Sequence, residues 1–167
     1  TENIDVEEYE SVENGLKKYT GKSLLIDVHS TNYTLSTAVD NDKIHVGTSP
    51  IPMMKAIKNK VEQDGFRAVM LRDGVAMVKF LAWIKGAVEA GGQTEITLAD
   101  RLEALRAEQQ HFKGISFDTI VGYEAHGAIV HYEATPETDI PIEPHGFVLI
   151  DSGAQYEDGT TDITRTI

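Results

Sequence analysis

Two aspartates near the end of the chain are spaced so that they could share metal ions. Asp151 ends an apolar run, and Asp162 follows the turn signal Glu157-Asp158-Gly159, so the sequence predicts a β-hairpin with one aspartate on each arm. Side chains alternate between the faces of a strand, and an even-numbered loop places both carboxylates on one face. Divalent metals suit such oxygen-rich sites, and a metal pair can activate water for hydrolysis. Without a metal, Asp151 would cap the following turn and Asp162 would face solvent.

The register of this hairpin decides whether the two aspartates can act together. A two-residue turn at Asp158-Gly159 would place Asp162 opposite Gln155 and leave Asp151 roughly 13 Å away along the strand, too far to share a metal. We therefore predict that the pairing centres near Tyr156-Glu157, with a bulge or wider turn at Asp158-Gly159.

Negative charge is concentrated in the same part of the chain. Ten acidic residues and no Lys or Arg lie between Gly114 and Thr164, whereas the other 17 acids and 15 bases nearly cancel. This stretch is either a solvated acidic face or a place for a cation or for basic groups of another segment. The net charge of −12 argues against nucleic acid as a partner.

Composition sets wider limits on the protein. The chain of 167 residues is 41% apolar and 25% charged, which is typical of a globular domain or of two small ones. It has no apolar run of about 18 residues that could span a membrane, and its start shows no signal-peptide pattern. It has no Cys, so it forms no disulfides and offers no thiolate ligands. We expect a cytoplasmic protein without a membrane partner. The missing initiator Met indicates a processed or excised chain.

The first two thirds of the chain are predicted to be mainly helical. Apolar spacing and capping signals predict the following elements: a helix over 5–19, a strand within 22–28, a short element over 32–39, a long helix from Met53 to Gly91-Gly92 and a helix from Thr94 to Phe112. The stripe of Val69, Asp73, Met77, Phe80 and Ile84 in the long helix indicates core packing. Two prolines, Pro50 and Pro52, mark a boundary between domains 1–49 and 50–167.

Strands dominate after Gly114. Alternating or continuous apolar runs predict strands over 117–121, 127–132, 147–151 and 160–167, with a proline-containing loop before the third. Helices followed by a run of strands indicate an α+β fold.

The string from Leu149 to Thr166 resembles the metal-binding hairpin of the aminopeptidase P branch of the pita-bread metallopeptidases, family M24. The resemblance implies that Asp151 binds one metal and that Asp162 bridges two. It also implies that His131, twenty positions before Asp151, contacts the scissile peptide group of a substrate. Thr164 is either a hydrogen-bond partner of a ligand carboxylate or a plain sheet threonine.

Other polar residues near the hairpin are given structural roles. His126 and His145 are expected to be surface histidines, and Arg165 is expected to pair with a carboxylate on the opposite face from the aspartates.

The resemblance extends to the rest of the chain. Residues 52–88 look like the helical entry to the catalytic domain, and residues 1–49 look like the end of a creatinase-like α/β domain that precedes it. The predicted fold is therefore α+β: the end of that α/β domain, followed by a truncated pita-bread half with helices packed on a mostly antiparallel sheet.

By the same resemblance, the parent protein would be a homodimeric metalloaminopeptidase that releases the N-terminal residue from peptides with proline second. It would use two divalent ions, Mn²⁺ first, with Zn²⁺ or Co²⁺ as alternatives. The family uses five metal ligands and this chain reaches only two before Ile167, so we expect the chain alone to be inactive.

Two other functions are weighed against this one. Prolidase, which cleaves Xaa-Pro dipeptides, is disfavoured by the long form of the hairpin string. A non-catalytic peptide- or protein-binding module is disfavoured by the intact Asp151 and Asp162.

Overall fold

The computed structural model describes residues 5–167, and these form two compact units, one ending at Ile57 and the other beginning at Lys58. The first four residues, which enter the argument against a signal peptide, lie outside the described part. The predicted domain boundary at 49/50 remains a prediction; the contacts divide somewhat later, after the helix that contains Pro52.

The first unit is built around two short parallel strands, in which Leu24 pairs with Ile44. Its predicted N-terminal helix is shorter than expected, and none of its residues is fully buried. The elements of this unit are η1 (Tyr9–Ser11), α1 (Val12–Lys17), β1 (Leu24–Ile26), α2 (Tyr33–Ser36), η2 (Asn41–Lys43), β2 (Ile44–Val46) and α3 (Ile51–Ala56).

The second unit contains the long helix α4 (Lys60–Ala90), and its predicted core stripe is confirmed. Asn59 and Glu62 form a capping box at its start, where each side chain accepts the other residue's backbone N–H. Gly91, with φ of 81°, ends it. The buried face includes Val69, Asp73, Met77, Phe80 and Ile84. Within residues 5–167 no helix is both long and apolar enough to cross a membrane.

Helix α5 (Glu95–Ala107) packs against α4 and contributes Leu98, Leu102 and Leu105 to the same core. Thr94 caps it through the Thr97 amide, with an N···O distance of 3.2 Å. The helix ends before the predicted Phe112, because Phe112 begins a strand that pairs with the C-terminal hairpin.

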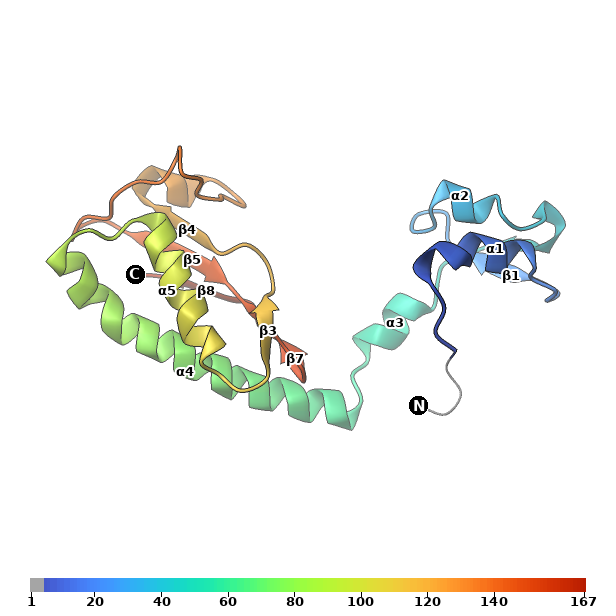
Figure 1. Ribbon diagram of the computed structural model, residues 1–167, viewed down its shortest axis with the longest axis horizontal. Coiled ribbons are helices and arrows are strands. Elements are labelled where there is room, and N and C mark those ends of the chain that lie inside the picture. The colour runs from blue at the N-terminus through green and yellow to red at the C-terminus, as the bar shows by residue number, and fades with distance from the viewer. Residues whose placement is uncertain (1–4) are drawn as a thin grey trace. The chain divides into compact units, whose positions relative to one another are not determined.

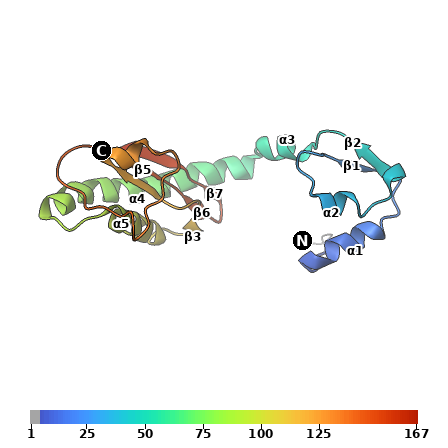
Figure 2. The same cartoon turned by 90° about the horizontal axis from the view of Figure 1, so that it is seen from above.

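The strands form two three-stranded sheets that share one long hairpin (Figures 1 and 2). In the first sheet the order is β4-β5-β8, and in the second it is β3-β6-β7, with every pair antiparallel. The mixed helical and antiparallel architecture agrees with the predicted α+β class. The strands are β3 (Phe112–Ile115), β4 (Ile120–Tyr123), β5 (Val148–Ser152), β6 (Ala154–Tyr156), β7 (Gly159–Thr160) and β8 (Ile163–Thr166).

The strand predicted over 127–132 is wrong. The chain forms the 3-10 helix η3 (Glu124–Ala128) and then a turn, with a left-handed φ of 55° at His131. The apolar side chains of Ile129 and Val130, which suggested a strand, are exposed by 52% and 83%. Hydrogen bonds to a buried carboxylate, described below, override the local preference for a strand.

A fully buried ion pair connects the two helices with the hairpin. Arg106 of α5 donates to both oxygens of Asp73 in α4, at 2.8 and 3.1 Å. The Tyr156 hydroxyl of β6 donates to the same carboxylate at 2.8 Å, and burial followed by this bond raises the pKa of Tyr156. Arg72 lies over the Tyr156 ring and pairs with Asp158 at the hairpin tip.

Replacing one partner of this pair should destabilise the second unit strongly. Arg106→Met leaves the Asp73 charge buried without its partner, so we expect the free energy of unfolding to fall by about 3–5 kcal/mol in urea titrations. The matched control Arg67→Met removes only an exposed pair with Asp64 and should cost less than about 1 kcal/mol. Equal costs for the two substitutions would show that the Asp73–Arg106 pair does not organise this unit.

Candidate metal-binding site

Asp151 lies on the open face of the sheet because of the alternation along β5. Val148, Ile150 and Ser152 are buried, and the first two belong to the core formed with α4 and α5. Asp151 lies between Ile150 and Ser152, so its side chain projects from the opposite face, away from that core. Core packing of β5 thus determines which face carries the candidate ligand.

The hairpin register differs from both arrangements considered from sequence. Asp151 pairs with Thr164, and Tyr156 pairs with Gly159, so the two-residue turn is Glu157-Asp158. The predicted bulge at Asp158-Gly159 is therefore wrong. Asp162 is two residues from Thr164 and so is a diagonal neighbour of Asp151 on the same face, where both line one pocket.

A bend between the two sheets lies beside Asp162. The Thr161 amide donates to the Ala154 carbonyl at 2.9 Å, and the Thr161 hydroxyl accepts from the Ala154 amide at 2.9 Å. Ser116 donates through its hydroxyl to the Thr161 carbonyl at 3.0 Å. A Cβ at Gly153 would lie 2.0 Å from that carbonyl oxygen, so only glycine allows the two arms to approach this closely.

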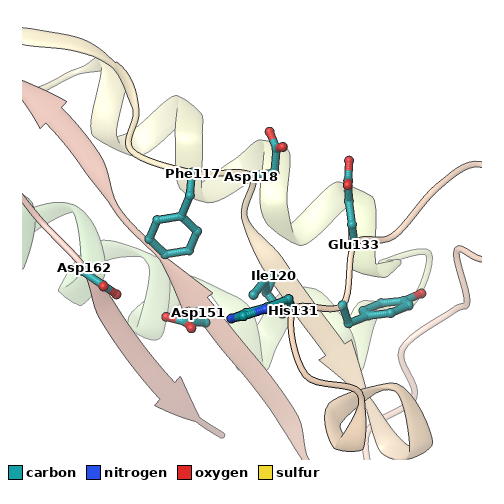
Figure 3. Close-up of a pocket in the computed structure, with 8 residues that line it drawn as sticks. Phe117, Asp118, Ile120, His131, Glu133, Asp151 and Asp162 are labelled. Atoms are coloured by element: carbon teal, nitrogen blue, oxygen red, sulfur yellow. The ribbon is translucent and has the colours of Figure 1, made fainter. Parts of the chain in front are cut away.

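The structure brings Asp151, Asp162 and His131 into one open pocket of about 420 Å³. In Figure 3 the two carboxylates face each other, and the His131 ring lies beside Asp151. Asp118 and Glu133 also line the pocket, but their carboxylates point away from Asp151. Its remaining lining residues are Phe117, Ile120 and Tyr132.

Thr164 bonds one of the candidate ligands directly. Its hydroxyl donates to Asp151 Oδ1 at 2.7 Å, which orients that carboxylate and leaves the other oxygen free of this bond. The neighbouring Arg165 donates to the Thr164 carbonyl at 2.7 Å rather than to the expected carboxylate.

His126 does not have the surface position expected from sequence, whereas His145 is exposed. The His126 Nδ1 atom lies 2.9 and 3.0 Å from the two oxygens of Glu95, a residue with no exposed surface. Tyr132 donates to the same carboxylate at 2.8 Å. Sequence reasoning missed Glu95 and Tyr132, because an acidic residue in the first turn of a helix is common and gives no sign of burial.

The donors in the pocket fit part of a divalent metal site. Two carboxylates on one face, one of them oriented by a hydroxyl, are the hard oxygen ligands that Mn²⁺ and similar ions accept. Among residues 5–167, no three His, Asp or Glu side chains are grouped so that they could hold an ion. The described residues therefore offer two candidate ligands, Asp151 and Asp162.

Sequence comparison places this architecture in a known class. Residues 64–167 match the model of metallopeptidase family M24, and residues 1–62 match the creatinase/prolidase N-terminal domain. The chain belongs to metallopeptidase family M24.

Two curated relatives match most of this chain. Aminopeptidase P1 of Arabidopsis thaliana is 39% identical over 165 residues, covering 86% of this chain and 26% of that protein. Aminopeptidase P1 of Lotus japonicus is 35% identical over 173 aligned residues, covering 90% of this chain and 26% of that protein. The chain thus spans about a quarter of the length of these curated relatives.

Solved structures show the same fold. The X-prolyl aminopeptidase of Caenorhabditis elegans, described as a cytosolic enzyme with a di-nuclear active site, superposes with a TM-score of 0.84 at 32% identity, covering 95% of this chain and 27% of that one. Prolidase from Pyrococcus furiosus superposes with a TM-score of 0.65 at 23% identity, covering 98% of this chain and 49% of that one. At this identity the likeness supports the fold alone.

The bend at Gly153 should be sensitive to a single added methyl group. Gly153→Ala places a Cβ against the Thr161 carbonyl, so we expect a loss of about 1–3 kcal/mol in the free energy of unfolding. Gly86→Ala is the matched control, because Gly86 is helical with open space around it and should gain about 1 kcal/mol. Opposite signs in urea titrations support the tight bend, and a neutral Gly153→Ala would contradict it.

The 167-residue chain by itself should bind Mn²⁺ weakly, in the millimolar range or above. Asp151 and Asp162 are partly or fully exposed, and no third ligand is grouped with them in the described part of the chain. Calorimetric titration measures this affinity, with an Asp151→Asn, Asp162→Asn variant as the control. Tight binding of two ions per chain would refute an incomplete site.

Proposed function

We propose that the protein containing this chain is a metalloaminopeptidase that releases the N-terminal residue from peptides with proline in second position. The observation that carries the proposal is the pocket in which Asp151, Asp162 and His131 meet, in a chain of family M24. The relatives named aminopeptidase P1 and the X-prolyl aminopeptidase structure support the specificity for Xaa-Pro peptides.

In this proposal the chain's own residues hold the metals and orient the substrate. Asp151 and Asp162 would bind two divalent ions, with Mn²⁺ favoured and Zn²⁺ or Co²⁺ as alternatives, and Thr164 would fix the rotamer of Asp151 through its hydroxyl. Bound ions of this kind supply Lewis acidity and an activated water. His131 would donate a hydrogen bond to the scissile peptide group and stabilise negative charge that develops there.

The chain supplies only part of the proposed site. The described residues bring two candidate ligands and one histidine together, and the chain matches only 26% of the length of a curated relative. We therefore propose that residues 5–167 alone are inactive and that the remaining ligands belong to a further segment of the complete protein.

Cellular setting and assembly belong to the same proposal. The C. elegans relative is described as cytosolic, which supports a cytoplasmic location for this protein. The homodimer, and the absence of nucleic acid and membrane partners, remain predictions from the resemblance and from the net charge of −12.

Activity assays on the complete protein test this proposal. With Mn²⁺ present we expect cleavage of Xaa-Pro-Xaa tripeptides, and Asp151→Asn should lower kcat/KM by at least about a hundredfold, because it removes a charge that positions the metals. Asp100→Asn, an exposed aspartate on α5, is the matched control and should leave kcat/KM unchanged.

Three outcomes separate the candidate functions. Cleavage of tripeptides supports the aminopeptidase. Cleavage of Xaa-Pro dipeptides alone would identify a prolidase instead. No cleavage of either, together with retained peptide binding, would favour the non-catalytic binding module.

A further inference from the structure

A buried carboxylate connects the start of α5 with the stretch of chain from Tyr123 to Tyr132. Glu95, the first residue of α5, accepts the backbone N–H of Tyr123 at 2.8 Å, the imidazole Nδ1 of His126 at 2.9 Å and the hydroxyl of Tyr132 at 2.8 Å. It has no exposed surface. A buried carboxylate is tolerated only where donors surround it, and here all three donors come from residues 123–132, which run from the end of β4 through η3 into the turn after it.

The backbone around Glu95 is held by helix capping and by hydrogen bonds to a neighbouring loop. Glu95 occupies the first turn of a capped helix, where the helix dipole favours a negative charge. The next residue, Ile96, donates its amide to Asp139 at 3.0 Å, and the Glu95 amide faces the Ile140 carbonyl at 3.4 Å. The proline-containing loop therefore bonds to the same helix end.

His131 is adjacent to one of the groups that Glu95 binds. Tyr132 is only 7% exposed, and its ring stacks on His126 with centroids 4.5 Å apart. Burial raises the pKa of the Tyr132 hydroxyl, so this group remains a donor to Glu95. Tyr132 therefore directs the chain inward immediately after His131.

The segment around His131 has little packing of its own. Ile129 and Val130 are 52% and 83% exposed, and His131 has a left-handed backbone with φ of 55°, a conformation that is strained for a non-glycine residue. Such a turn persists only where neighbouring contacts impose it. The inward contacts of this turn run through Tyr132 and His126 to Glu95.

We propose that Glu95 is a positioning residue for His131, acting through Tyr132 and His126 to hold the histidine in the pocket beside Asp151. Tyr132 links this cluster to the pocket, because it lines the pocket together with His131 and Asp151. The positioning is a property of this chain, and its catalytic consequence rests on the proposed peptidase function.

The direct test observes His131 without using activity. Histidine-selective NMR on the chain resolves its six histidines, and His131→Gln assigns the relevant signal. Tyr132→Phe removes one hydroxyl and keeps the ring, so we expect the His131 imidazole signal to shift and its motion to increase. Glu95→Gln keeps the shape and one acceptor oxygen, and it should produce a smaller change than Glu95→Ala.

The second unit provides a matched control for the loss of a buried hydroxyl. Tyr156 also donates to a fully buried carboxylate at 2.8 Å, but its partner is Asp73 and it does not line the pocket. Tyr156→Phe should therefore destabilise the chain similarly and leave the His131 signal unchanged. An unchanged His131 signal in Tyr132→Phe, or an equal change in both variants, would overturn the proposal.

A double-mutant cycle of Tyr132 and His131, measured as kcat/KM in the complete protein, tests whether the positioning of His131 affects catalysis. Tyr132→Phe should lower kcat/KM about ten- to a hundredfold, mainly through kcat, because His131 is displaced from a reacting group. In a His131→Ala background the same substitution should cause no further loss. A displaced His131 with unchanged activity would retain the positioning and reject the role of His131 in the proposed function.

Discussion

The ion pair between Asp73 and Arg106 is the interaction on which the second unit depends. It lies where α4, α5 and β6 meet, and Tyr156 completes it by donating to the same carboxylate. A buried charge without a partner is strongly destabilising, so the three elements can only meet in the arrangement that satisfies it. The hairpin is thereby fixed to the helices through Tyr156, and Arg72 with Asp158 adds a second connection at the tip.

The candidate site follows from two buried carboxylates on the helices. Asp73 fixes the hairpin that carries Asp151 and Asp162, and Glu95 fixes the turn that carries His131. Both carboxylates lie on the side of the sheet covered by helices, whereas the pocket opens on the other side. Apolar burial on one face and polar chemistry on the other is the division that a half-covered antiparallel sheet allows.

Much of the fold could be predicted from sequence because its signals are local. The stripe from Val69 to Ile84, the stop at Gly91-Gly92 and the apolar run ending at Asp151 depend on neighbours within a few residues. The turn after η3 could not be predicted in this way. Ile129 and Val130 favour a strand locally, but Tyr132 and His126 bond Glu95, more than thirty residues away in sequence. Contacts over such separations depend on packing rather than on propensity.

The sequence by itself determined the family, which the match over residues 64–167 shows, and it singled out Asp151, Asp162 and His131 as candidate site residues. Only the tertiary structure decided how they meet. The turn at Glu157-Asp158 makes Asp162 a diagonal neighbour of Asp151, and Thr164 is the residue directly opposite. Strand register depends on how the whole hairpin packs against β3, β4 and α4, because every side chain changes face when the register shifts by one residue.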